Sequence, residues 1–311
     1  MILNFTTVKK VTPFEKIIGM KFKLLCVLVS ASLFSFTPPP SHSLNITDNT
    51  AFSRLPDDKK FPSLLPNNVN TTPENRVVDS MYSRMNLQYY NLPRNVFFAA
   101  YKGYEYLLSK GALQNPDYLT ICDYTQSSSA KRLYILDITS CRMVYNTYVS
   151  HGKKSGKEFA TSFSNSDNSN KSSLGFMVTG STYYGKAGYS LHLSGMEEGF
   201  NDHVYRRSIV MHGSSYVDAQ RADEDREMGR SFGCPAVPYA EHRAIINLIK
   251  EGSCFYAAAG NSYYLNNSQI INANFIWPVL QKKENMLTNN TPTTDDNVAI
   301  FPTKNVKYQF K

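Results

Sequence analysis

One short segment of the sequence combines the residue types that thiol catalysis requires. Cys234 directly follows Gly233 in residues 229–237 (GRSFGCPAV), a stretch typical of a turn between two elements. A nucleophilic cysteine must form a thiolate, stay partly accessible, and meet both a base and backbone N–H donors. A glycine beside it allows backbone conformations in which neighbouring amides face one oxygen atom. Cys234 is therefore a candidate nucleophile, although an isolated Gly–Cys pair is usually structural.

A candidate base lies upstream of this cysteine. The run 208–211 ends at His212 and Gly213, which places the histidine at the end of a predicted strand. A side chain at a strand end can point into a cleft, and an imidazole with a pKa near neutrality can accept a thiol proton. His212 would then be the base for Cys234, although a lone His–Gly pair usually marks only a turn.

The N-terminal sequence predicts export from the cytoplasm. Lys21 and Lys23 stand at the start of the apolar run 22–36, and prolines 38–40 end it. This order of basic, apolar and polar segments is typical of a secretory signal peptide. We predict a signal peptide over residues 1–43, with Met20 as an alternative start, and a periplasmic or cell-envelope location. The alternative is an uncleaved membrane anchor, for which the run is short.

The composition limits the remaining classes of function. The 311 residues carry a formal net charge of +8, which suits a cell-wall polyanion as well as a nucleic acid. The sequence has no zinc-type cysteine pairs, phosphate-binding glycine loop or nucleic-acid motif, so we predict no metal and no nucleic-acid partner. Cleavage of the signal peptide would leave four cysteines, an even number that permits two disulfides. They are Cys122, Cys141, Cys234 and Cys254. The strand-forming neighbours of Cys122 and Cys254 favour buried thiols instead.

The elements that would position Cys234 and His212 are mostly strands. A helix is predicted after Pro93, where apolar residues recur at three- and four-residue spacing up to Gly111. A second, short helix is predicted over 241–250. Strand-like runs occupy 118–124, 132–137, 143–149, 173–179, 189–194, 209–212 and 254–259.

These elements predict one catalytic domain, mainly β with packed helices, over residues 76–285. Residues 44–75 are rich in Asn, Thr, Pro and Ser and predict a flexible linker. Residues 286–311 are polar and predict a loose C-terminal tail.

Blocks of sequence on both sides of His212 carry a family resemblance. They are KRLY (131–134), HG (151–152), SGK (155–157), ATSFSN (160–165), SSLGF (172–176), GYSL (188–191), IVMHG (209–213) and SFGCPAV (231–237). In this order they resemble the murein L,D-transpeptidase catalytic domain (YkuD-like) family, in the branch whose motif reads Ser-x-Gly-Cys-Pro-Ala-Val. The resemblance covers about 118–258 and implies an α+β fold: a mainly β sandwich or curled sheet with a few packed helices.

The resemblance implies a cysteine transpeptidase that remodels peptidoglycan. Such enzymes attack the L,D bond between diaminopimelate and D-alanine of a stem peptide, form a thioacyl-enzyme, and pass its acyl group to an amine. By position, Cys234 would be the nucleophile and His212 the base, with the Gly213 carbonyl fixing the histidine tautomer. The amides of Gly233 and Cys234 would form the oxyanion hole, and Ser231 would line the cleft. No cofactor is implied.

The sequence departs from the common family pattern beside the nucleophile. Phe232 stands where many members have a second histidine, and Pro235 and Ala236 stand where others have a polar residue and a substrate-binding arginine. A charged insert at 218–227 separates His212 from Cys234, as a mobile lid or, as we favour, an exposed loop. Candidate substrate-binding residues therefore come from elsewhere: Arg230, His151, Arg207 and Lys186.

There are three alternatives to a transpeptidase. An L,D-carboxypeptidase would pass the acyl group to water and trim tetrapeptide stems. A catalytically silent wall-binding module would need neither Cys234 nor His212, so their joint presence argues against it. A papain-like peptidase would have its cysteine before its histidine, the reverse of the order here. The residues leave open the acyl acceptor and the oligomeric state.

Overall fold

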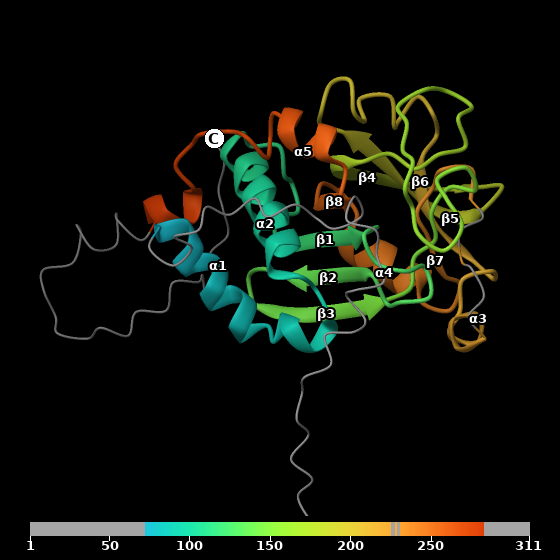
Figure 1. Cartoon of the computed structure of the whole chain (residues 1–311), viewed down its shortest axis with the longest axis horizontal. Coiled ribbons are helices and arrows are strands. Elements are labelled where there is room, and N and C mark those ends of the chain that lie inside the picture. Colours follow the sequence, from blue (N-terminus) through green and yellow to red (C-terminus); the bar gives the residue numbers. More distant parts are fainter. Residues whose placement is uncertain (1–71, 225–227, 229–230, 283–311) are drawn as a thin grey trace, which may run out of the picture. The chain divides into compact units, whose positions relative to one another are not determined.

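The structure is a computed structural model that describes residues 72–224, 228 and 231–282 (Figure 1). Three predicted segments lie outside the described residues: the signal peptide (1–43), residues 44–71 of the linker, and the tail (286–311). The candidate residue Arg230 also lies outside them.

One eight-stranded sheet forms the centre of the domain, in the order β3-β2-β1-β8-β4-β5-β6-β7. The β1–β8 and β6–β7 pairs are parallel, and the other neighbours are antiparallel. Figure 1 shows the sheet curling between β1–β3 and the strands β4–β7. The predicted mainly β class, with a curled sheet and a few helices, is confirmed. The strands are β1 (Tyr118–Asp123), β2 (Leu133–Asp137), β3 (Arg142–Thr147), β4 (Gly175–Gly185), β5 (Gly188–Gly195), β6 (Val210–Ser214), β7 (Ala236–Pro238) and β8 (Cys254–Ala258).

Helices pack on this sheet. Helix α2 (Arg94–Ser109) packs against β1 and β8, and α4 (His242–Ile249) packs against β6, β5 and β1. Both helices bury residues at three- and four-residue spacing, which gives each an apolar face toward the core. Helix α1 (Pro73–Arg84) lies on α2, followed by the short 3-10 helix η3 (Leu87–Tyr90).

Helix α2 approaches the sheet closely at one glycine. A Cβ atom at Gly103 would lie 2.0 Å from the Phe176 Cζ atom in β4. The Phe176 ring in turn stacks on Tyr256 of β8, with 4.2 Å between the ring centroids. Gly103 therefore sets the helix–sheet distance, although glycine is a poor helix former.

Three helices differ from the sequence predictions. Helix α1 begins inside the predicted linker because the Thr72 hydroxyl caps it, accepting the Asn75 N–H at 3.2 Å. Helix α3 (Ala219–Asp223) lies in the charged insert and is capped by Asp218, so part of the predicted loop is helical. Helix α5 (Ser262–Asn267) follows β8 and was also not predicted.

The four described cysteines are all free thiols. Cys122, Cys141 and Cys254 are buried, as predicted for Cys122 and Cys254, whereas Cys234 is partly exposed. Burial raises the pKa of Cys122 to about 12, so this thiol is unreactive at neutral pH. In the part of the chain that the structure describes, no helix combines the length and apolarity that a membrane crossing needs.

Candidate active site

The pairing of β6 with β7 brings Cys234 next to the strand that carries His212. His212 pairs with Ala236 in the parallel ladder, and the same register carried two residues back aligns Cys234 with Val210. The Val210 N–H accordingly donates to Cys234 Sγ at 3.5 Å. Residues two apart in a strand share one face of the sheet, so Val210 and His212 lie on the same face, beside the thiol.

The Cys234 thiol is protonated at rest. It donates a long hydrogen bond to the Ser208 carbonyl oxygen, with 3.7 Å between the atoms. Although the residue is partly exposed, protein atoms surround most of its sulfur, and this burial raises the thiol pKa. The Val210 N–H and the Arg207 guanidinium act in the opposite direction and favour the thiolate. A base must therefore remove the proton before Cys234 can attack.

The strand orients His212 as such a base. The sequence predicted His212 at the end of a strand. Strand β6 continues to Ser214, however, so His212 lies within the strand. Its Nδ1 atom lies 3.0 Å from the Gly213 carbonyl oxygen, and because a carbonyl only accepts, Nδ1 carries the proton. Burial lowers the pKa of His212, and the Gly213 hydrogen bond opposes this effect. The imidazole is then neutral at pH 7, with Nε2 free to accept a proton.

The turn before Cys234 depends on Gly233 and Ser231. Gly233 has a φ of +126°, and a Cβ there would lie 2.7 Å from the Lys171 carbonyl oxygen. Its N–H donates to Ser231 Oγ at 3.1 Å, and Ser231 is buried, so this serine supports the turn and does not line a cleft. The Gly233 amide is thus occupied. Of the two expected oxyanion donors, the Cys234 N–H remains, and it donates to no described residue.

Arg207 places a fixed positive charge near Cys234. Its guanidinium donates to two carbonyl oxygens and two serine hydroxyls of residues 164–173, at 2.6 to 3.0 Å. Burial lowers the Arg207 pKa, but a guanidinium stays charged at neutral pH. Because its partners all belong to one loop, Arg207 holds that loop beside the cysteine turn.

Two other candidate substrate-binding residues, His151 and Lys186, are not exposed beside the thiol. His151 is fully buried, where its Nδ1 accepts from Arg132 Nη2 at 2.8 Å and its Nε2 lies 3.3 Å from the Gly156 carbonyl oxygen. Its imidazole therefore joins loops together in the interior. Lys186 is exposed at the β4–β5 turn, six residues from the His192 that pairs with Val210. That separation corresponds to about 20 Å along a strand.

Two side chains near the thiol and the imidazole, His242 and Tyr216, were not predicted, and Phe232 was named only as a departure from the family pattern. The His242 ring packs under Gly213, where a Cβ would lie 2.5 Å from the His242 Cγ. The Tyr216 phenol lies close enough to Cys234 for the thiolate charge to raise its pKa, although burial is the main cause. Phe232 is 68% exposed and carries the Lys153 ammonium 4.1 Å from its ring centroid. His242 begins α4 and Tyr216 follows β6, both outside the motif blocks, whereas Phe232 stands inside the block 231–237.

The arrangement supports acyl transfer through a thiol. It combines a cysteine that needs deprotonation, a neutral imidazole with a fixed tautomer, and a half-buried cation near the cysteine. Among residues 72–224, 228 and 231–282, no group of three or more His, Cys, Asp or Glu side chains could hold a metal ion.

Three solved structures have distant similarity to the chain. An L,D-transpeptidase from Mycobacterium smegmatis is 8% identical with a TM-score of 0.29, and the match covers 46% of this chain and 59% of that one. An L,D-transpeptidase from Xylanimonas cellulosilytica is 16% identical with a TM-score of 0.27, covering 50% of this chain and 68% of that one. The helical cell shape determining protein Pgp2 from Campylobacter jejuni, as a mutant, is 13% identical with a TM-score of 0.29, covering 64% and 66%.

Comparison with protein families is more informative. No curated protein sequence matches the chain. The family model described as the L,D-transpeptidase catalytic domain matches residues 88–258, which is more than half of the 311 residues. This range contains the sheet, Cys234 and His212. The chain therefore belongs to the L,D-transpeptidase catalytic domain family.

Proposed function

We propose that the protein is a peptidoglycan-remodelling L,D-transpeptidase of the cell envelope, with Cys234 as nucleophile and His212 as base. The observation that carries the proposal is the β6–β7 register, which places the thiol on the Val210 N–H and beside the face of His212. Family membership supports the substrate, a stem peptide with an L,D bond between diaminopimelate and D-alanine.

The first half-reaction follows from the protonation states. Neutral His212 takes the thiol proton at Nε2, and the Cys234 sulfur attacks the carbonyl carbon of the L,D bond. The Cys234 N–H stabilises the resulting oxyanion. The C–N bond then breaks, His212 returns its proton to the departing D-alanine nitrogen, and a thioester remains on Cys234. The thiol, which now faces Ser208, must rotate or use a bridging water to reach the imidazole.

The second half-reaction passes the acyl group to an acceptor. His212 removes a proton from an amine of another stem or of a protein, a C–N bond forms, and the C–S bond breaks. The imidazole then returns this proton to the Cys234 thiolate, which restores the resting thiol. With water as the acceptor, the same residues would act as an L,D-carboxypeptidase. Arg207 supports recognition of a carboxylate on the stem, because it is cationic and lies near Cys234.

Mass spectrometry of the reaction products tests this proposal. The full protein is incubated with a tetrapeptide-stem muropeptide, with and without an acceptor stem. We expect a cross-linked dimer with loss of D-alanine. Loss of D-alanine alone would assign the carboxypeptidase reaction instead, and an unchanged muropeptide would support the wall-binding alternative.

Two cysteine variants separate the role of Cys234 from a general loss of thiols. Cys234→Ala should abolish turnover and keep the fold. Cys254→Ala is the matched control, because Cys254 is a fully buried thiol whose pKa is raised by burial. Full activity of Cys234→Ala would contradict the proposed mechanism.

A further inference from the structure

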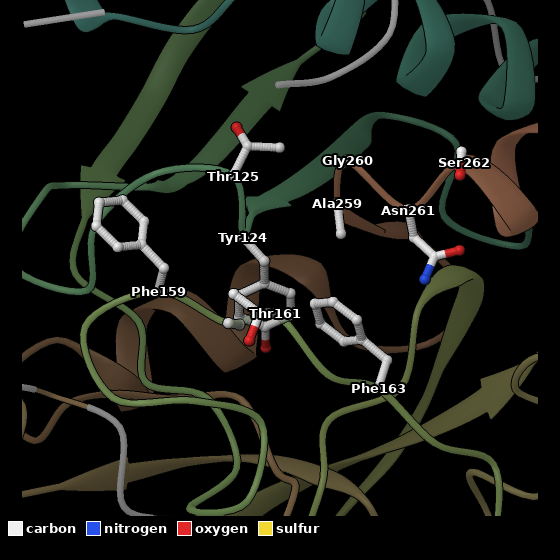
Figure 2. Close-up of a pocket in the computed structure, with 10 residues that line it drawn as sticks. Tyr124, Thr125, Phe159, Thr161, Phe163, Ala259, Gly260, Asn261 and Ser262 are labelled. Atoms are coloured by element: carbon white, nitrogen blue, oxygen red, sulfur yellow. The ribbon is translucent and has the colours of Figure 1, made fainter. Parts of the chain in front are cut away.

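A cavity of about 410 Å³ lies outside the Cys234–His212 region. The residues that follow β1 and β8 line one side of the cavity. Residues 159–163, in the loop between β3 and β4, line the other side. Figure 2 shows Tyr124 and Phe163 around its middle, with Asn261 facing it from the far side. The volume is typical of a small-molecule site. Cys234, His212 and Arg207 are not among its lining residues.

The lining is uncharged throughout, which limits the ligand. Three aromatic rings, from Tyr124, Phe159 and Phe163, face the cavity together with side chains that offer hydroxyl or amide groups. An ionic ligand would lose its hydration here without gaining a partner of opposite charge. A neutral ligand with one flat apolar face and several hydroxyl or amide groups fits both the rings and the polar groups. The polar side chains are Thr125, Thr161, Asn261 and Ser262.

Asn261 adds one oriented donor. Its Oδ1 accepts the Tyr264 N–H at 2.8 Å as the cap of α5, which fixes the orientation of the amide. Its Nδ2 is thereby directed toward the Phe163 side of the cavity and donates to no described residue (Figure 2). A donor held in this way can bind a ligand carbonyl, such as that of an acetamido group.

The cavity and the cysteine turn share the loop between β3 and β4. Phe163 of the cavity lining is followed by Ser164, whose carbonyl oxygen accepts from Arg207 Nη1 at 2.6 Å, and Arg207 acts on the Cys234 thiol. In the same loop, Ser172 Oγ donates to the Gly233 carbonyl oxygen at 3.3 Å. The cavity therefore lies on the loop that packs against the residue before Cys234.

We propose that this cavity binds an N-acetylated amino sugar of the glycan strand while the attached stem peptide reaches Cys234. This inference rests on the proposed function for its biological substrate. The flat face of the pyranose ring would pack on the partly exposed Phe163, and the acetamido oxygen would accept from Asn261 Nδ2. The enzyme would then recognise a stem together with the sugar that carries it.

Calorimetric titration of the full protein with tri-N-acetylchitotriose tests the inference without any turnover. We expect saturable binding, and weaker binding of the deacetylated, cationic trisaccharide. The decisive variant is Asn261→Asp, because aspartate keeps the α5 cap but removes the amide donor and adds a charge. It should weaken trisaccharide binding by roughly fivefold or more.

The matched control is Asn266→Asp, the same change at an exposed position of α5 outside the lining. It should bind the trisaccharide as the unaltered protein does. Phe163→Ala gives a second reading of the same site and should also weaken binding. Absence of binding, equal binding of the cationic sugar, or unaltered affinity in Asn261→Asp would each overturn the inference.

The kinetic form of the test separates this inference from the proposed function. Asn261→Asp should raise KM for a disaccharide-linked stem and leave KM for the free stem peptide unchanged. If the free peptide is processed but no trisaccharide binds, the sugar site is wrong and the transpeptidase proposal stands. If the trisaccharide binds but neither substrate is processed, the proposed reaction fails and the sugar site stands.

Discussion

Cys234 and His212 have protonation preferences that favour a neutral resting pair. Burial raises the pKa of the thiol and lowers the pKa of the imidazole, so neither group is charged before substrate binds. A preformed thiolate–imidazolium pair would need the opposite shifts. The proposed chemistry is therefore general-base catalysis, in which the thiol loses its proton as it attacks.

The pH profile of kcat/KM should show this state of His212. The imidazole must be neutral to act as base, and burial lowers its pKa from 6.5, so activity should fall only when the pH drops below 6.5. Measuring D-alanine release from about pH 4.5 to about pH 8 would locate this acidic limb. A limb centred above 6.5 would mean that His212 carries its proton at rest and would contradict the proposed role.

Arg207 should tune the reactivity of Cys234. Arg207→Gln removes a cation that favours the thiolate, so the thiol pKa should rise and alkylation by iodoacetamide at pH 7 should slow roughly threefold to tenfold. Arg206→Gln is the matched control, because the Arg206 side chain is 60% exposed and its ion pair with Asp167 is a surface one. Equal alkylation rates in the two variants would show that Arg207 does not act on the thiol.

At the scale of elements, the absence of a side chain at Gly103 allows helix α2 to pack closely on the sheet. Gly103→Ala should raise helix propensity by about 1 kcal/mol. The added Cβ would nevertheless meet the Phe176 ring, which is itself stacked on Tyr256. We expect a net loss of roughly 1–3 kcal/mol in the free energy of unfolding, measured with urea. Ser109→Ala, at an exposed position of the same helix, should change it little.

Elements with strong side-chain patterns could be predicted from the sequence, and the others could not. Strands β1, β2 and β8 match their predicted ranges within one residue, because their apolar runs are buried along almost their whole length. Strand β4 extends to Gly185, well beyond the predicted end at 179, since its second half is largely polar or exposed. Strand β7 has three residues and ends at Pro238, too short for any periodicity.

Only those parts of the site that form a local sequence pattern could be predicted from the sequence. Cys234 and His212 stand in motifs that one sequence can show. The partners of Arg207 and the packing of His242 under Gly213 depend on which loops meet in space. Ser231 illustrates the limit: its motif position indicated the cleft, but its hydroxyl is used inside the turn.

At the scale of the whole molecule, a buried carboxyl joins α2 to the last described segment. Glu105 Oε2 accepts the Val279 N–H at 3.1 Å, and the Glu105 side chain also hydrogen-bonds to Tyr101. The hydrogen bonds lower the Glu105 pKa, but burial has the larger effect and raises it from 4.5 to about 7. The folded state therefore prefers the neutral carboxyl at this position.

This preference should appear in the pH dependence of stability. The folded pKa lies above the unfolded one, so the contribution of Glu105 is complete below pH 4.5 and is lost as the pH rises to about 7. The loss is on the order of 3 kcal/mol. Glu105→Gln keeps a neutral acceptor for Val279 and should remove this part of the slope in urea unfolding. Parallel pH profiles for the two proteins would contradict the assignment.

The central claim is that Cys234 carries the acyl group of the substrate. The most direct measurement is intact-mass spectrometry of the protein quenched in acid during turnover of a tetrapeptide stem, or after exposure to a carbapenem, with peptide mapping of the adduct. We predict one acyl adduct on Cys234 that is absent from Cys234→Ala and present in Cys254→Ala. An adduct on another residue, or none while the stem is processed, would contradict the account.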